Sequence, residues 1–363
     1  MDILLLIAVM VLAATNGAND NFKGVAGLYG SRRASYATSL AWASATTLAG
    51  SLCSVFFAHT LLTAFTGAGL VPTDIAAQTR FALAVAGGGA LTVGLAAWRG
   101  LPISTTHALV GAMAGAGLVA AGRGVHFSTL GGSFLLPLLV SPLIAIVPAM
   151  VLAPLLRRWA ARKEAPACIC TLTPTMRLEG AALIDLPTQV ISGTVVECET
   201  IGARPIWQSA WHRLEDVALL LLGGMVSFAR GLNDTPKIAA LLLPVAMLDG
   251  RSSLAVLTVG LAMLLGGVIG ARRVARTISD RITHLDVGAG LAAGLVTSVL
   301  VSTASFNGLP VSTTHVSVGA VAGAGQGNGV GIDRKVMSAI VSSWLVTLPL
   351  AAMFGALFYA CLH

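Results

Sequence analysis

The sequence has 363 residues, of which 56% are hydrophobic and only 10% are charged, and its mean hydropathy is +0.85. Soluble domains carry about 25% charged residues, so soluble enzymes and disordered, collagen-like or disulfide-rich proteins are excluded. The net charge of +7 does not indicate nucleic-acid binding, because the basic residues lie mainly between apolar runs. The composition therefore predicts an all-α polytopic membrane protein, in which the 41 glycines allow close helix packing.

Ten apolar segments meet or approach the length of about 20 residues that a membrane-crossing helix needs. A polar interval separates them into two groups of five. The segments are 3–18, 34–58, 76–98, 102–122 and 127–156, followed by 214–230, 253–271, 284–306, 310–330 and 336–361. No basic segment precedes the first run, so we read it as a spanning helix rather than a cleaved signal. We expect a first membrane repeat at 1–156, a linker or cap at 157–212 and a second, inverted membrane repeat at 213–363.

The Lys and Arg residues predict the orientation, because cytoplasmic connections are enriched in them. With the N-terminus outside, 16 basic residues fall in cytoplasmic connections and three, Arg80, Arg123 and Arg251, fall outside. We therefore expect both termini outside and the 157–212 loop in the cytoplasm, with the protein in the inner or plasma membrane. Five crossings per half is an odd number, so the second half runs through the membrane upside down relative to the first.

The two halves also share sequence. Residues 96–117, AAWRGLPISTTHALVGAMAGAG, align without gaps with residues 304–325, ASFNGLPVSTTHVSVGAVAGAG, and 15 of 22 positions are identical. A second pair is NGANDNFKG at 16–24 and RGLNDTPKI at 230–238, which share Gly-x-Asn-Asp and a Lys three positions after Asp. Inverted repeats whose apolar segments are interrupted by Gly or Pro indicate a secondary transporter with a site near the membrane midplane.

The repeated motifs carry ionisable groups at membrane depth. Asp20 and Asp234 lie at or just past the ends of long apolar runs, where a charge is costly and therefore indicates function. A cation, a proton or the neighbouring Lys must compensate each of them. The alternative is that each aspartate simply lies at a solvated helix end, but this does not explain why the two halves carry matching acids.

The proline-containing motif predicts an anion site. Pro102 and Pro310 are suited to the first turn of a helix, and the following Ser-Thr-Thr supplies hydroxyls and free N–H groups at a positive helix end. The two expected cradles are Ser104, Thr105 and Thr106, and Ser312, Thr313 and Thr314. The alternative role for these residues is simple capping of a core helix. The short segments before the cradles, 85–98 and 291–306, are expected to form re-entrant hairpins with them.

At this point the chain resembles the inorganic phosphate transporter (PiT) family of sodium- or proton-coupled permeases. The resemblance rests on the duplicated Gly-x-Asn-Asp and Pro-[Ile/Val]-Ser-Thr-Thr-His motifs and covers nearly the whole chain except the middle loop. It implies a dimeric, inverted-repeat helical fold with phosphate between the repeats. It also implies that Asn19, Asp20, Asn233 and Asp234 contribute to the substrate and cation sites, while the two Ser-Thr-Thr cradles hold the anion.

Two lysines depart from the family pattern, in which small residues often follow Asn-Asp. Lys23 and Lys237 are spaced i, i+3 from the aspartates and are positioned to pair with them or to contact the anion. Our hypothesis is that they replace part of the positive charge that sodium otherwise brings. That would favour proton coupling or another oxyanion such as sulfate.

Other polar residues have weaker assignments. His107 and His315, one turn into their helices, are packing residues or second-shell groups of the site. Five cysteines without paired spacing predict no disulfide framework. Residues 167–201 alternate apolar and polar positions, which predicts a few strands in a small cytoplasmic domain. Cys168, Cys170 and Cys198 lack a fourth metal ligand, so packing is favoured over a metal site or redox regulation.

The motifs favour a symporter that moves inorganic phosphate by alternating access, with Na⁺ or H⁺ as coupling ion and no cofactor. The expected partners are phosphate, the lipid bilayer and a second copy of the chain, but no nucleic acid. A permease for sulfate or a related oxyanion is the alternative. A channel is disfavoured because the polar groups gather at one place, and a membrane hydrolase is disfavoured because an enzyme gains nothing from an inverted second copy.

Overall fold

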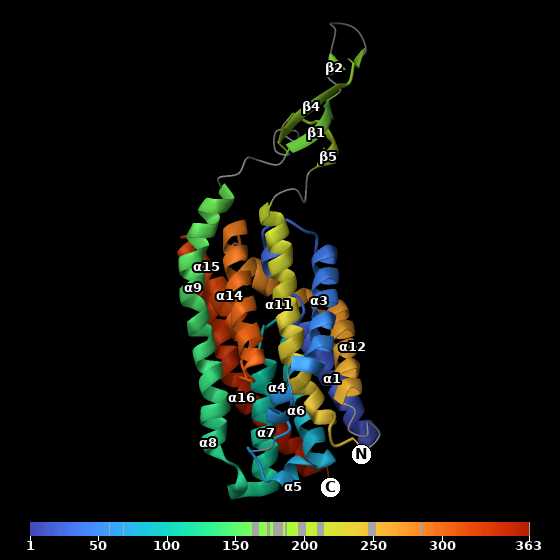
Figure 1. Ribbon diagram of the computed structural model, residues 1–363, viewed down its shortest axis with the longest axis vertical. Coiled ribbons are helices and arrows are strands. Elements are labelled where there is room, and N and C mark those ends of the chain that lie inside the picture. Colours follow the sequence, from blue (N-terminus) through green and yellow to red (C-terminus); the bar gives the residue numbers. More distant parts are fainter. Residues whose placement is uncertain are drawn as a thin grey trace.

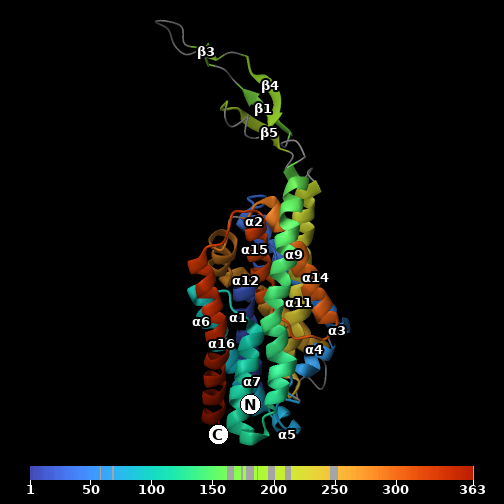
Figure 2. The ribbon, with the colours of Figure 1, turned by 90° about the vertical axis from the view of Figure 1, so that its left-hand side faces the viewer.

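The structure is a computed structural model that describes residues 1–57, 59–67, 69–161, 167–172, 175–176, 184–185, 187–194, 201–208, 214–245, 252–283 and 285–362. Most of these residues form one helical bundle, and a small β region stands at one end of it (Figure 1). Figures 1 and 2 place both chain termini at the end of the bundle away from the β region. The termini and the middle loop therefore lie at opposite ends of the molecule.

The described part of the first half contains nine α-helices. They are α1 (Asp2–Asp20), α2 (Ala26–Gly30), α3 (Tyr36–Phe57), α4 (His59–Ala64), α5 (Thr73–Ala76), α6 (Thr79–Arg99), α7 (Thr105–Ala121), α8 (Phe127–Thr129) and α9 (Leu136–Ala161). The short helices η1 (Gly122–Gly124) and η2 (Leu130–Leu135) join the last three. The described part of the second half contains α11 (Leu214–Ala239), η3 (Ala240–Leu242), α12 (Ser252–Gly270), α13 (Arg272–Arg276), η5 (Thr277–Arg281), α14 (Val287–Phe306), α15 (Thr313–Gly327) and α16 (Arg334–Cys361).

All ten predicted apolar segments are helical, which confirms the all-α polytopic membrane fold. Among the described residues, eight helical stretches are long and apolar enough to cross a membrane. Of the ten predicted segments, the two that fall outside this set are in α11 and α15. The α11 helix contains several charged residues, and α15 has 15 residues. Both helices carry the second copies of the repeated motifs, whereas α1 and α7, which carry the first copies, are long and apolar enough to span.

Helix packing is reciprocal between the halves. The α7 helix packs against α16, and α15 packs against α9; likewise α1 packs against α12, and α11 against α3. In Figures 1 and 2, α7 lies toward the end with the termini and α15 toward the end with the β region. This exchange of partners is the arrangement that a duplicated unit produces.

Glycine pairs make two of these contacts possible. A Cβ atom added to Gly319 would lie 2.6 Å from the carbonyl oxygen of Pro142 in α9, and one added to Gly323 would meet the carbonyl of Ile146. In the other half, Gly111 and Gly115 approach the α16 backbone in the same way. These Gly-x-x-x-Gly spacings therefore serve close helix packing.

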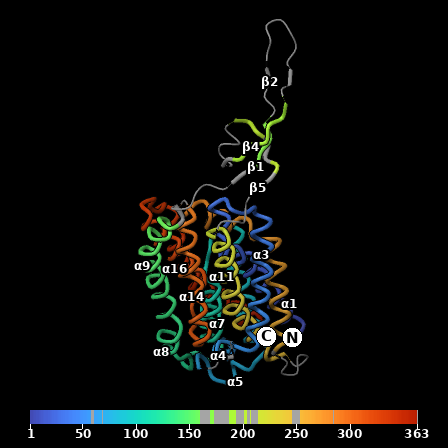
Figure 3. The backbone as a smooth tube through the Cα atoms, turned by 45° about the horizontal axis from the view of Figure 1, so that its top comes forward, coloured from blue at the N-terminus to red at the C-terminus, as the bar shows by residue number. Residues whose placement is uncertain are grey.

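The helices before the expected cradles are longer than the sequence analysis assumed. The α6 helix has 21 residues and α14 has 20, and each packs against the helix that follows it, α7 or α15. The tube in Figure 3 shows α7 and α14 within the bundle. Each pair is a helical hairpin with its connection at residues 100–104 or 307–312.

The middle loop contains strands, as predicted. Antiparallel strands β4 (Gln189–Thr194), β1 (Ala167–Leu172) and β5 (Arg204–Gln208) form a three-stranded sheet in that order, with a register shift between Ile169 and Cys170. Strands β2 (Thr175–Met176) and β3 (Ile184–Asp185) form a second pair. The α9 helix continues to Ala161, beyond the expected boundary at residue 156.

Candidate anion and cation site between the two halves

The two hairpin connections end in the same glycine motif. Gly100 has φ 71° and Gly308 has φ 68°, in the left-handed region that favours glycine. In the first half, the N–H of Leu101 donates to the carbonyl of Ala96, and the N–H of Gly100 donates to Ala97. The second half repeats these bonds at equivalent residues. This glycine cap ends each helix and directs the chain to the centre of the bundle.

The serines of the cradles are N-caps. The N–H of His107 donates to Ser104 Oγ at 3.1 Å, and the N–H of His315 donates to Ser312 Oγ at 3.2 Å. The helices begin at the following threonines, so Pro102 and Pro310 lie outside the first turn, contrary to expectation. An N-cap side chain stabilises the helix start better than proline placed there, and it leaves the N–H groups of the threonines without intrahelical acceptors.

The carboxylate of Asp20 is surrounded by hydrogen-bond donors from both motifs of the first repeat. Asp20, the last residue of α1, accepts a hydrogen bond from the amide of Asn19 and pairs with the ammonium group of Lys23. Asn16 donates to Asp20 Oδ2 at 3.3 Å and to Thr105 Oγ1 at 2.9 Å. Thr105 Oγ1 also lies 3.5 Å from Asp20 Oδ2. The acidic and threonine motifs, 85 residues apart, therefore form one cluster.

The second carboxylate repeats this geometry within the continuous helix α11. Asn233 donates to Asp234 Oδ1 at 2.9 Å, and Thr313 Oγ1 donates to Asp234 Oδ2 at 3.4 Å. Lys237 Nζ lies 3.7 Å from Asp234 Oδ1. The difference between the copies is that α1 ends at Asp20, whereas α11 continues through Pro236 to Ala239.

The lysines connect the two halves. Lys23 donates to the hydroxyl of Thr314, and Thr314 donates to the carbonyl of Ile103 at 2.7 Å. In the reciprocal set, Lys237 Nζ donates to Thr106 Oγ1 at 3.0 Å and to the carbonyl of Val311 at 2.8 Å. Each lysine therefore reaches the threonine of the opposite repeat, next to a hairpin connection of the bundle.

Arg230 is a site residue that the sequence analysis did not assign. Its guanidinium donates to Asn16 Oδ1 at 2.9 Å, Asn21 Oδ1 at 3.1 Å and Thr47 Oγ1 at 3.3 Å. Its Nε lies 3.7 Å from Asp234 Oδ2. The sequence did carry a signal for this residue, because Arg230 and Asn16 occupy matching positions directly before the two Gly-x-Asn-Asp motifs. Arg230 is therefore where the two copies differ most in charge.

The site is fully desolvated and carries an excess of positive charge. Five charged side chains, each at most 5% exposed, gather there: Asp20, Lys23, Arg230, Asp234 and Lys237. With all of them ionised, three cations face two carboxylates and leave one net positive charge. Removing ions from water costs several kcal/mol each unless partners and hydrogen bonds compensate, so this cluster favours the entry of an anion.

The two histidines stack beside this site. The ring centroids of His107 and His315 lie 4.7 Å apart, and His315 also lies 4.0 Å from the ring of Trp344. His315 Nδ1 hydrogen-bonds to the carbonyl of Leu138 at 2.9 Å. Trp344 Nε1 donates to the carbonyl of Pro102 at 3.1 Å. The described hydrogen bonds of these histidines go to the cap serines and to the Leu138 carbonyl rather than to the carboxylates, and their rings pack beside the cradle threonines that precede them.

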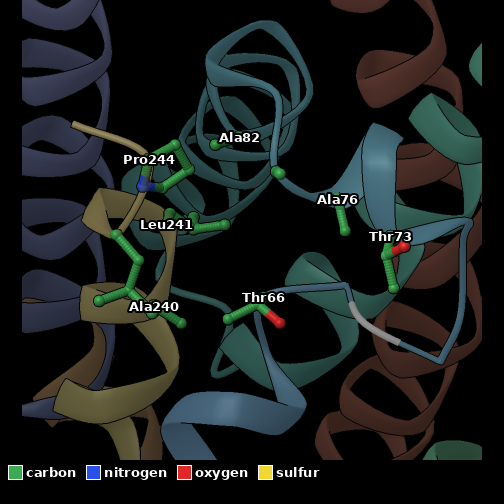
Figure 4. A pocket seen from close by; sticks show the side chains of 9 residues that line it. Thr66, Thr73, Ala76, Ala82, Ala240, Leu241 and Pro244 are labelled. Atoms are coloured by element: carbon green, nitrogen blue, oxygen red, sulfur yellow. The ribbon is translucent and has the colours of Figure 1, made fainter. Parts of the chain in front are cut away.

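Two cavities approach the cluster from different ends. One, of about 20 Å³, adjoins Lys23 and Ser317 and has room for about one water. The other, of about 290 Å³, is lined by Thr66, Thr73, Ala240 and their neighbours near the termini (Figure 4). Phe65, next to Thr66, is 1% exposed, and Lys237 Nζ lies 5.6 Å from the centre of its ring. Phe65 therefore packs beside Lys237, and its neighbour Thr66 lines the second cavity.

The cysteines of the middle loop correct one expectation. Cys170 is buried and disulfide-bonded, although the sequence analysis predicted no disulfide framework. Cysteine spacing alone does not reveal a single bridge. A disulfide sulfur is not a thiolate, so Cys170 is not a metal ligand here, and the described residues contain no cluster with metal-ligand composition. The side chains of Cys168 and Cys198 lie outside the described residues.

Named proteins of other organisms are similar to this chain in sequence. The Mycobacterium tuberculosis strain H37Rv protein named "Probable low-affinity inorganic phosphate transporter" is 26% identical over 374 residues, which cover 99% of this chain and 78% of that protein. The Chlamydia pneumoniae protein named "Putative phosphate permease" is 26% identical over 324 residues, with coverages of 74% and 76%.

A solved structure titled "The sodium-dependent phosphate transporter" has the same fold. Its TM-score is 0.75 at 23% sequence identity, with 99% of this chain and 98% of that chain covered. The description of the phosphate transporter family matches residues 16–355, which include both copies of both motifs. The chain therefore belongs to the phosphate transporter family.

Proposed function

We propose that this protein is a symporter that moves inorganic phosphate across the membrane by alternating access of one central site. The observation that carries the proposal is the reciprocal bonding of Lys23 to Thr314 and of Lys237 to Thr106. An anion between the two helix starts would receive these ammonium and hydroxyl donors from both halves. A relative movement of the halves would then expose the same donors to either side of the membrane.

The residue roles follow from these contacts. The threonines of the two cradles and both lysines bind the anion, and Ser104 and Ser312 shape the helix starts while capping them. Asn19 and Asn233 orient the adjacent aspartates and complete the substrate and cation sites. The His107 and His315 rings pack against each other and support the two helix starts that carry the cradle threonines.

The carboxylates favour phosphate over sulfate. Monohydrogen phosphate carries a proton that it can donate to Asp20 or Asp234, whereas sulfate at neutral pH is only an acceptor. An acceptor-only anion beside a carboxylate is repelled without a compensating hydrogen bond. Phosphate is therefore the substrate that uses both the cationic and the anionic part of the site.

We also propose that the two lysines supply charge that a metal ion would otherwise bring. Lys23 and Lys237 lie beside the carboxylates that a sodium ion would use, together with Asn19 and Asn233. Sodium binding there would require an ammonium group to move away from its carboxylate. This arrangement favours a proton as the coupling ion, and sodium is the alternative that the solved relative's title raises.

The proposal also covers the orientation of the chain in the membrane and its oligomeric state. Both termini lie outside and the middle loop lies in the cytoplasm, because that orientation places 16 basic residues inside and three outside. The repeats at 1–156 and 213–363 then have opposite orientation, and the reciprocal helix packing supports this. The protein functions as a homodimer in the lipid bilayer, as the family resemblance implies.

Proteoliposomes test the function directly. Purified protein is reconstituted, and uptake of labelled phosphate is followed under an imposed proton gradient, sodium gradient or neither, with unlabelled sulfate as competitor. We expect concentrative phosphate uptake that sulfate does not inhibit. Uptake of sulfate but not of phosphate would show that sulfate is the substrate instead. Flux that only dissipates a gradient would indicate a channel.

A further inference from the structure

We propose that the cavity between α1, α6 and the α12–α13 connection binds the phosphate headgroup of an anionic phospholipid. The cavity measures about 600 Å³ and lies outside the charged cluster. The inference does not depend on which anion the central site transports, because it rests on a different set of residues. The class of ligand follows from the cations and the apolar surface of this cavity and from its position at the level of the lipid headgroups.

Three arginines form the polar side of the cavity. Arg272, Arg273 and Arg276 follow α12 within one and a half turns, and all three are exposed. Among the described residues, none of the three has an ion pair with an acidic side chain. Three unneutralised guanidinium groups around one cavity form a site for a phosphate, which accepts paired hydrogen bonds from arginine.

The arginines are held in place by the bundle. Arg273 donates from a guanidinium nitrogen to the carbonyl of Trp98 at 2.5 Å, and Arg272 lies 6.0 Å over the ring of Tyr36. Thr277 donates to the carbonyl of Gly100 at 2.8 Å, which fixes the segment after α13 to the end of α6. Arg273 and Arg272 are therefore held against α6 and α3 and do not move freely.

Apart from Thr15, the rest of the cavity lining is apolar, which favours a lipid over a free ion. Its walls include small residues of three helices, Ala18, Gly94, Ala97 and Gly270. Beside them, Trp98 is 63% exposed and Ile269 is 84% exposed. Exposed apolar side chains next to arginines at the end of a spanning helix mark the level of lipid headgroups. An acyl chain can therefore lie along the small residues while its phosphate contacts the arginines.

The experiment compares lipid binding by two triple variants of the full-length protein. Binding of phosphatidylglycerol, phosphatidylcholine and inorganic phosphate to the detergent-purified protein is measured by native mass spectrometry and by thermal stabilisation. The test variant is R272Q/R273Q/R276Q. The matched control, R158Q/R334Q/K335Q, removes three exposed cations elsewhere.

We expect phosphatidylglycerol to bind more tightly than phosphatidylcholine to the wild type and the control, and its affinity for the test variant to fall on the order of 100-fold. Equal binding of phosphatidylglycerol by both variants would overturn the proposal. Inorganic phosphate that binds the arginines and displaces the lipid at equal concentration would identify a free-anion site instead.

A second measurement keeps the arginines intact. Phosphatidylglycerol with brominated acyl chains quenches nearby tryptophans, and Trp98 lines the cavity. We expect brominated phosphatidylglycerol to quench more of the wild-type fluorescence than brominated phosphatidylcholine does, and Trp98→Phe to remove this difference. The same quenching by both lipids in the wild type would contradict a headgroup-specific site.

Discussion

The properties of the central site are set by individual buried residues rather than by the fold. Arg230 replaces the neutral Asn16 of the other repeat, and it links Asp234 of its own half to Asn16 and Asn21 of the first half. A buried ion pair adds little net stability over an apolar pair, but an unpaired buried charge is very costly. The charges of this site are therefore interdependent, and changing one of them should affect folding and transport together.

Arg230→Gln tests this interdependence. The change leaves Asp234 with fewer charged partners in a desolvated site, so we expect a loss of about 3–5 kcal/mol in the free energy of unfolding. Arg230→Lys retains the charge and should lose less. Thermal unfolding in detergent measures both, with exposed Arg158→Gln as a control that changes stability by less than about 0.5 kcal/mol. Equal stability of the Gln and Lys variants would contradict the role of the charge.

The lysines give a second prediction at this scale. Lys23→Gln and Lys237→Gln each remove a charge-assisted hydrogen bond of about 1.5–3 kcal/mol, so each should raise the KM for phosphate by about 10-fold or more. Lys335→Gln, on the surface, should leave the KM unchanged. Uptake kinetics in proteoliposomes measure these values. Unchanged affinity and unchanged ion dependence in both site variants would reject the proposed charge replacement.

At the scale of elements, the two hairpin connections position the site. Each ends a helix with a left-handed glycine, passes a proline and starts the next helix with a serine cap. The helix starts supply backbone N–H donors, and the main-chain carbonyls of Ile103 and Val311 accept hydrogen bonds from Lys23 and Lys237. The same local sequence therefore builds the same half-site twice.

Glycine substitution tests the importance of this connection. Gly100→Ala places a side chain at φ 71°, and a left-handed residue with a Cβ costs about 1–2 kcal/mol. Gly308→Ala has the same backbone cost, and its Cβ would also lie 2.8 Å from Thr60 Cβ. We expect both to lower stability and phosphate uptake, and Gly308→Ala to do so more strongly. Gly132→Ala, where an added Cβ meets nothing within 4 Å, is the control in unfolding measurements.

At the scale of the whole molecule, both chain termini lie at one end and the middle loop at the other (Figure 1). The Lys and Arg distribution places the loop in the cytoplasm, whereas the Cys170 disulfide is a bond typical of oxidising compartments. The charge rule governs the orientation of a whole polytopic chain, so we give it the greater weight.

Labelling of cysteines tests the orientation. Cys361, exposed near the C-terminus, should react with a membrane-impermeant maleimide in intact cells. Ser192→Cys, exposed in the middle loop, should react only after the cells are permeabilised. The reverse pattern would place the loop outside, as the disulfide alone would favour.

Much of this architecture could be predicted from the sequence. Apolar length located all ten helical segments, and the duplicated motifs predicted the aspartates beside the Ser-Thr-Thr cradles, where Asp20 contacts Thr105 and Asp234 contacts Thr313. Duplication makes such contacts predictable, because two copies with the same motifs fold and pack in the same way.

Other features depend on tertiary contacts that a single sequence does not reveal. Arg230 was visible as a charge within a motif, but its bonds to α1 and α3 arise only when the halves pack together. Phe65 has no motif, and its place beside Lys237 follows from the path of the chain after α4. Both prolines lie outside the helices, because the side chain of the serine that follows each of them, after one intervening residue, accepts a hydrogen bond from the first helical turn and so starts the helix there.

The central claim is that an anion site with built-in cations moves phosphate by using donors from both halves. Its most direct test is phosphate uptake into proteoliposomes by the wild type and the K23Q/K237Q variant, under separate proton and sodium gradients. We predict concentrative, proton-driven uptake by the wild type without a sodium requirement, and loss of most of this uptake in the variant. Sodium-driven uptake that is unchanged in the variant would contradict the claim.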